Sequence, residues 1–99
     1  MKTSSRLAAL ANPSRLAVLQ WLKDPVRHFP PQEHADAMSV GVCCSFLTDK
    51  LGIAPATTTR HMKILADAGF VRARRIGKFT YYRRVDASLQ ALRREIGSL

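Results

Sequence analysis

The residues with the clearest chemical potential lie between positions 54 and 63, where small and polar side chains are followed by basic ones. Proline at position 55 suits the first turn of a helix, because its missing N–H is not needed there. On a helical wheel, Ala56, Arg60 and Lys63 fall opposite Met62, which belongs to the inward face. A helix start with short side chains lets the backbone approach base edges in the major groove of DNA. The side chains expected to contact DNA are Ala56, Thr57, Thr59, Arg60, His61 and Lys63.

Catalytic and cofactor chemistry have no comparable pattern. No nucleophile stands beside a base, no glycine-rich loop suits a phosphate, and no carboxylates are paired, so we expect neither an enzyme nor a cofactor. The adjacent Cys43 and Cys44 would point about 100° apart on a helix and would seldom bind one metal ion. We interpret both as buried and unreactive. A metal site, with Cys43 as its best candidate, and a cysteine redox switch are the alternatives.

The residues around the basic helix have the pattern of a helix-turn-helix over about positions 42–69. The first helix is predicted over Val42–Leu51, where apolar residues form one stripe. Gly52 supplies the left-handed conformation that ends this helix. The second helix begins near Pro55 and stops at Gly69. This arrangement places the second helix where it can enter a DNA groove.

A β-hairpin is predicted directly after the helix-turn-helix, over about positions 71–84. Val71–Arg75 and Phe79–Arg84 are rich in aromatic and β-branched residues, and the turn between them contains Gly77. Arg75 and Lys78 lie at or beside its tip. A basic tip next to a DNA-reading helix can follow the phosphate backbone or enter the minor groove, so we interpret the hairpin as a wing.

Apolar stripes at the two ends of the chain predict helices over about 3–11 and 86–97, in addition to one over Pro13–Lys23. The stripe of the last helix is narrow, which is typical of a helix that docks on its own domain or on a second copy. We expect the first and last helices to form a symmetric homodimer interface. Its predicted residues are Leu7, Leu10, Leu89, Leu92 and Ile96.

The segment 24–41 is predicted to be irregular, because three prolines interrupt it. Residues 32–38 are expected to form at most one or two helical turns. The segment is too long for a simple connection between helices. We consider three interpretations of this segment: a lid, a contact with the partner subunit, or a site for a small effector.

Composition agrees with one small DNA-binding domain over residues 1–99. Lys and Arg number 16 against 7 Asp and Glu, a net charge of +9, and this surplus indicates a polyanionic partner. No apolar run approaches the ~18–20 residues of a membrane helix, and no secretory signal is recognisable, so we expect a cytoplasmic protein without membrane contact. The predicted fold class is mainly α with a small β-hairpin (α+β): about five helices and a two-stranded wing. A basic RNA- or ribosome-associated winged helix is the alternative function.

Four stretches in this order resemble the ArsR-type winged-helix repressors of bacteria. They are Leu10–Leu19 (LANPSRLAVL), Leu51–Ile53 followed by Thr57–Leu65 (TTTRHMKIL), Ala68–Val71 (AGFV) and Arg74–Arg83 (RRIGKFTYYR). The resemblance implies a homodimer on an inverted-repeat operator, which represses transcription until an inducer, often a metal ion, releases it. It also implies DNA contacts at Ala56, Thr57, Thr59, Arg60 and His61, and a backbone contact near Lys63.

Three departures from the family pattern concern sensing more than DNA binding. Ala56 replaces a usual serine in the second helix of the helix-turn-helix. Many metal-sensing members carry Cys-x-Cys at the start of the helix before the turn, whereas here Ser45 stands in the second cysteine position after Cys43. The segment 24–41 is longer than the usual connection. The sequence therefore predicts a DNA-binding regulator whose effector is unidentified, with a Cys-based metal or redox sensor as the alternative.

Overall fold

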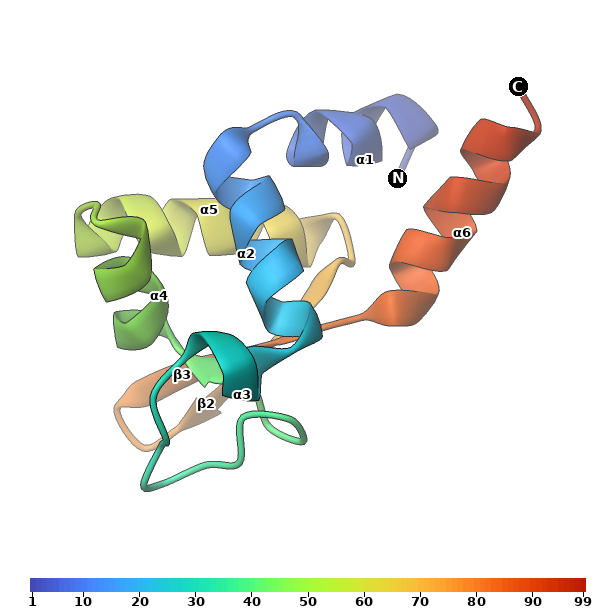
Figure 1. The fold of residues 1–99 in the computed structure, drawn as a ribbon. Coiled ribbons are helices and arrows are strands. Elements are labelled where there is room, and N and C mark those ends of the chain that lie inside the picture. The colour runs from blue at the N-terminus through green and yellow to red at the C-terminus, as the bar shows by residue number, and fades with distance from the viewer.

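The computed structural model describes residues 1–99 and contains six helices and three short strands. The helices are α1 (Thr3–Leu10), α2 (Pro13–Lys23), α3 (Pro25–His28), α4 (Cys44–Leu51), α5 (Pro55–Asp67) and α6 (Asp86–Gly97). The strands are β1 (Val42–Cys43), β2 (Val71–Ile76) and β3 (Phe79–Arg84). Figure 1 shows α1, α2 and α5 above the sheet, α3 in front of it, and α6 rising away from it toward α1. The predicted class, mainly α with a small sheet, is confirmed.

Local chemistry explains where the central helices begin and end. The side-chain oxygen of Asn12 accepts a hydrogen bond from the Arg15 N–H at 3.1 Å and caps α2, which starts with Pro13. Gly52 adopts φ +67° and closes α4 in the left-handed conformation. The turn that follows leads into α5, whose first residue is Pro55. The helix-turn-helix is therefore formed by α4 and α5.

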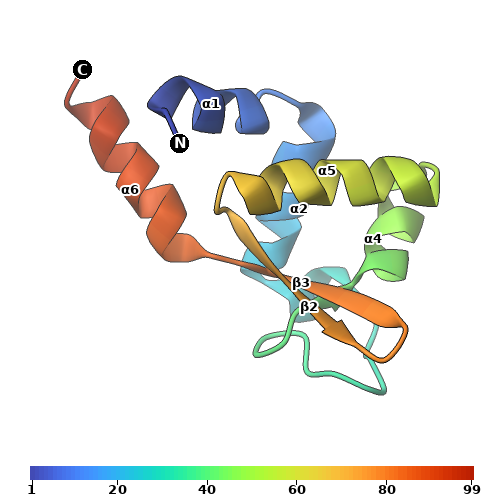
Figure 2. The same ribbon diagram turned by 180° about the vertical axis from the view of Figure 1, so that it is seen from behind.

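The core lies between α2, the helix-turn-helix and the inner face of the sheet. Its fully buried side chains include Val18 of α2, Leu47 of α4, Met62 and Leu65 of α5, and Phe70. Figure 2 shows α5 lying across α2, with its outer side turned away from it. Burial of a large apolar side chain contributes about 1.5–3 kcal/mol, so these contacts fix the inward face of α5 and leave the opposite face free.

The sheet has three antiparallel strands in the order β1-β3-β2, where a two-stranded hairpin was predicted. The prediction that Val42 and Cys43 begin a helix is wrong, because they pair with Tyr82 and Tyr81 of β3. Helix α4 therefore begins at Cys44. The pairing partner lies far along the chain, and local helical periodicity cannot reveal it.

The segment 24–41 differs from its prediction in the position of its helix. Residues 32–38 contain no helix, and the one helical turn is α3, with Pro25 at its first position. The side chain of Gln32 holds the rest of the segment against β1. Its amide N–H₂ donates to the carbonyls of Ala35 at 3.1 Å and Gly41 at 2.9 Å, and its oxygen accepts from the Cys43 N–H at 2.7 Å.

Gly41, at the end of this segment, touches the sheet with its backbone. Its φ is +124°, and a Cβ atom placed on it would lie 2.4 Å from the carbonyl oxygen of Tyr82. No residue with a side chain fits there without moving the backbone of β3. The close approach lets β1 pair with β3 immediately afterwards.

Candidate nucleic-acid interface

Helix α5 is hereafter called the reading helix. Its outer side presents the residues predicted to contact DNA. Thr58, Met62 and Leu65 point into the core. Five of the six predicted residues are exposed: Ala56, Thr57, Thr59, Arg60 and Lys63. Figure 2 shows that no other element covers this side of the helix. The structure therefore groups these five on one accessible surface.

The exposed side chains offer different chemistry along the reading helix. The Ala56 methyl suits apolar contact with the methyl group of thymine. The Thr59 hydroxyl donates to the Pro55 carbonyl at 3.1 Å, so it offers acceptor lone pairs and a methyl group to a partner. Lys63 pairs with Asp67 at 3.1 Å. Arg60 has no carboxylate partner within 4 Å, which leaves its guanidinium free for a base or a phosphate.

His61, the sixth predicted residue, is half-buried and faces α2. Its Nδ1 lies 3.0 Å from Nη1 of Arg15. Arginine is only a donor, so Nδ1 accepts and the imidazole carries its proton on Nε2. This contact could not be predicted from the sequence, since the two residues lie on different helices and no periodicity links them.

Burial, Arg15 and Arg60 lower the pKa of His61 from its ordinary value of 6.5. Between the lowered pKa and 6.5, the unfolded chain binds more protons at this residue than the folded chain, so the free energy of unfolding should rise with pH. We expect urea denaturation to show that the free energy of unfolding rises less between pH 5.5 and 7.5 in His61→Leu than in the unchanged protein. An equal rise in both proteins would contradict the lowered pKa of His61. The other two histidines, His28 and His34, are present in both proteins, so their titration does not explain a difference.

The wing formed by β2 and β3 lies beside the reading helix and confirms the predicted hairpin. Gly77 and Lys78 form a two-residue turn, and Gly77 adopts φ +59°. Arg75 and Lys78 are exposed and have no carboxylate within 4 Å. The Lys78 ammonium lies 5.5 Å from the centre of the Phe79 ring. The wing tip therefore carries two cations available to a phosphate backbone.

Three further arginines, none of them predicted as a DNA contact, gather on the outer face of the wing. Arg72 lies directly opposite Arg83 in the strand pairing, and Arg74 follows on the same face. Together with Ser39 and Val40 they line a shallow recess. Like charges directly opposite each other are destabilising in a sheet. The period of two in residues 72 and 74 was the signal that could have identified this basic cluster.

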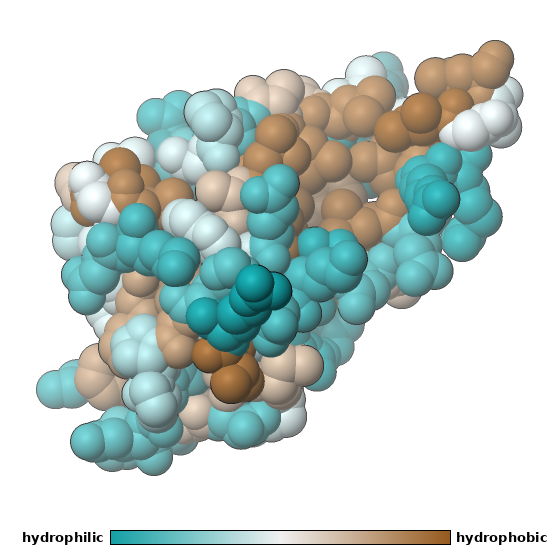
Figure 3. Space-filling view, in the orientation of Figure 1, coloured by the Kyte–Doolittle hydropathy of each residue, from teal (hydrophilic) through white to brown (hydrophobic).

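The predicted dimer residues differ in how far the single chain buries them. Leu92 is 2% exposed and belongs to the monomer core, so its prediction as a dimer contact is wrong. Leu10 and Leu89 are half-buried against the same core. Leu7 and Ile96 are 38% and 44% exposed. Figure 3 shows an apolar surface extending over α1 and α6, and we call the exposed part formed by Leu7, Ile96 and Leu99 the dimer face.

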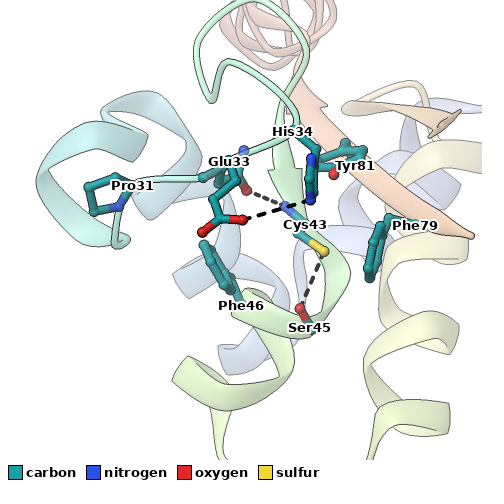
Figure 4. Close-up of a pocket in the computed structure, with 9 residues that line it drawn as sticks. Pro31, Glu33, His34, Cys43, Ser45, Phe46, Phe79 and Tyr81 are labelled. Atoms are coloured by element: carbon teal, nitrogen blue, oxygen red, sulfur yellow. Dashed lines mark hydrogen bonds and ion pairs between the residues drawn. The ribbon is translucent and has the colours of Figure 1, made fainter. Parts of the chain in front are cut away.

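The region around Cys43 forms a recess of about 300 Å³ between the segment 24–41, the start of α4 and the wing. Figure 4 shows the Cys43 thiol near Ser45, with Phe46 and Phe79 on the walls. The Cys43 sulfur lies 3.3 Å from the Ser45 oxygen, and the His34 ring stacks on Phe79. No three His, Cys, Asp or Glu side chains are grouped as a metal site requires. Burial raises the pKa of the neighbouring Cys44.

The geometry can be compared with known proteins. Residues 10–74 match the helix-turn-helix domain family. The chain is 49% identical over 84 residues to the uncharacterized HTH-type transcriptional regulator YbzH of Bacillus subtilis (strain 168), covering 85% of this chain and 84% of the relative. The chain belongs to the helix-turn-helix transcriptional regulators. It is therefore a DNA-binding protein of this class, not an enzyme.

Solved structures place the fold of this regulator among the ArsR-type winged helices. An ArsR family transcriptional regulator superposes with a TM-score of 0.72 at 21% identity, covering 96% of this chain and 82% of that chain. An ArsR-like regulator from Rhodococcus sp. RHA1 gives a TM-score of 0.69 at 23% identity, with 97% and 76% covered. The predicted resemblance to the ArsR-type winged helices is confirmed at the level of the fold. No helix of the regulator has the length and apolarity needed to cross a membrane.

Proposed function

We propose that this regulator is a homodimeric repressor that binds an inverted-repeat operator with one reading helix from each copy. The observation that supports this function best is the exposed face of α5 from Ala56 to Lys63, lying beside a wing with a basic tip. A short-chained, partly basic helix face suits the major groove, while Arg75 and Lys78 suit the adjacent phosphates.

The proposed dimer uses the dimer face on α1 and α6. These two helices contact each other, and Arg6 forms an ion pair with Glu95 between them. Most assemblies of one chain are symmetric, so two copies joined here would present two reading helices related by a two-fold axis. An inverted repeat has the same symmetry, and its half-sites are reached when their spacing matches that of the two helices.

A binding experiment separates this function from its alternatives. The probes are a duplex containing an inverted repeat from upstream of the protein's own gene, a shuffled duplex and a structured RNA. We expect two chains on the inverted repeat, weaker binding to the other probes, and lower expression of a reporter controlled by that repeat. One chain per duplex, a preference for the RNA, or increased reporter expression would each contradict part of the proposal.

Replacing Arg60 by alanine should cost roughly 1–3 kcal/mol of operator binding and relax specificity at one base pair of each half-site. The reason is that its guanidinium is exposed on the reading helix without a carboxylate partner. Affinities for operators changed at single positions measure the effect. If Arg60→Ala binds the complete set as the unchanged protein does, Arg60 does not read a base.

Replacing Lys78 by alanine should weaken all duplexes by a similar factor and reduce the slope of log K against log salt by about 1 per chain. Lys78 is exposed at the wing tip, where a phosphate is the expected partner. Titrations at several salt concentrations measure the slope. A loss confined to one operator sequence would instead indicate a base contact.

We also propose that a small molecule bound in the recess beside Cys43 relieves repression. Its walls come from the segment 24–41, from α4 and from the wing, so a ligand there would touch the wing, which is proposed to contact DNA, and α4, the first helix of the helix-turn-helix. A ligand that binds the native state raises the melting temperature by mass action. A panel of metals, oxidants and small aromatic compounds tests this: a compound that raises the melting temperature should weaken operator binding, and a complete absence of shifts contradicts the site.

A further inference from the structure

The guanidinium of Arg15 joins three helices of the regulator. Its Nε donates to the Ala9 carbonyl at 2.6 Å, and its Nη2 donates to the Ala8 carbonyl at 3.4 Å. Both carbonyls belong to the last turn of α1. Its Nη1 donates to Nδ1 of His61 at 3.0 Å. Arg15 itself lies in the first turns of α2, so one side chain joins α1, α2 and the reading helix.

The chemistry of this contact favours a fixed geometry. Arginine presents its donors in a planar, rigid fork, and three acceptors occupied at once define its orientation. The last carbonyls of a helix lack partners within the helix and attract a positive charge. The group is half-buried, which weakens competition from water. A lysine at this position would keep the charge but would lose the fork.

The helices that Arg15 joins have different proposed functions: α1 contributes to dimerisation and the reading helix contacts DNA. Helix α1 carries Leu7 of the dimer face, while His61 lies in the reading helix, one residue after Arg60. Ala9 of α1 shares the buried core with Met62 and Leu65 of the reading helix, so the Arg15 fork adds a directional contact to an apolar one. The angle between them sets the distance and twist between the two reading helices of a symmetric dimer.

We propose that Arg15 is a positioning residue, acting through His61, that fixes the reading helix relative to α1 and thereby selects the spacing between the two operator half-sites. The proposal rests on the proposed function as a dimer on an inverted repeat. One added base pair separates the half-sites by about 3.4 Å and rotates them by about 34°. If the two reading helices are held firmly, the dimer binds an operator of altered spacing weakly. If they are held loosely, the helices can move to the new positions and the affinity changes less.

The experiment measures spacing selectivity, the ratio of affinities for the operator and for versions with one base pair added to or removed from the centre. His61→Leu removes the acceptor, and Arg15→Lys removes the fork. Both variants should lower the ratio by about fivefold or more, within the usual range of coupling between two sites. His61→Asn retains an acceptor near the position of Nδ1 and should preserve the ratio. Arg27→Lys makes the same substitution at an exposed arginine of α3 and should leave the ratio unchanged.

A single half-site duplex separates positioning from simple loss of contact or stability. One chain on one half-site involves no spacing, so Arg15→Lys should bind it as the unchanged protein does. Unchanged spacing selectivity in both His61→Leu and Arg15→Lys overturns the proposal, as does an equal loss in His61→Asn and His61→Leu. Failure of the unchanged protein to bind an inverted repeat as a dimer would instead overturn the proposed function.

Discussion

Replacing Ile96 by lysine should separate the dimer and weaken operator binding by about 10²–10⁴-fold, the advantage that two linked contacts have over one. Ile96 is 44% exposed on α6 and belongs to the dimer face. In a two-fold symmetric interface, each introduced ammonium group would be buried against apolar surface near its counterpart. Burying an unpaired charge is strongly unfavourable. Sedimentation equilibrium gives the oligomeric state, and titration of the operator gives the affinity.

Gln90→Lys provides the matched control, because it adds the same charge to α6 at an exposed position. Gln90 lies beside a recess lined by Arg84, Asp86 and Arg93, on a different side of α6 from the dimer face. This variant should remain dimeric and keep its operator affinity. An Ile96→Lys protein that is still dimeric and binds the operator normally would remove α6 from the interface.

Replacing Gly41 by alanine should lower the free energy of unfolding by about 2–5 kcal/mol, the combined cost of an unfavourable φ and of a clash in a packed region. The added Cβ would lie 2.4 Å from the Tyr82 oxygen and 2.9 Å from the Arg83 nitrogen. Both are backbone atoms of β3, so no side-chain rotation relieves the contact. Urea denaturation at neutral pH measures the change.

Gly97→Ala is the control for Gly41→Ala. Gly97 ends α6, and a Cβ there would meet no atom within 4 Å. Alanine is the better helix former, so this variant should be as stable as the unchanged protein or slightly more stable. Equal stability of Gly41→Ala and the unchanged protein would show that β1 can leave the sheet without loss.

The parts of the regulator that the sequence predicts well depend on local periodicity. The outward arc of Ala56, Arg60 and Lys63 follows from a spacing of 3.6 residues, and the wing follows from Gly77 between two β-rich runs. Neither inference needs knowledge of a distant partner. These features therefore appear in the structure close to their predicted positions.

The features that the sequence did not reveal depend on contacts between distant positions. Val42 matches a helical stripe, yet tertiary pairing with Tyr82 places it in a strand. Arg15 looks like one of many arginines until His61 is found beside it. The apolar stripe of α6 correctly predicts a buried face, but not that Leu92 packs on its own domain while Ile96 remains exposed. Periodicity identifies apolar faces without naming their partners.

The side chain of Gln32 has a consequence for how the regulator avoids self-association through its sheet. Strand β1 lies at one edge, and its outward backbone groups are the Gly41 carbonyl and the Cys43 N–H. The Gln32 amide bonds both, as the peptide group of a neighbouring strand would. Open strand edges are templates for edge-to-edge aggregation. One amide thus occupies the place of a fourth strand, and on the opposite edge the arginines of β2 repel an incoming chain.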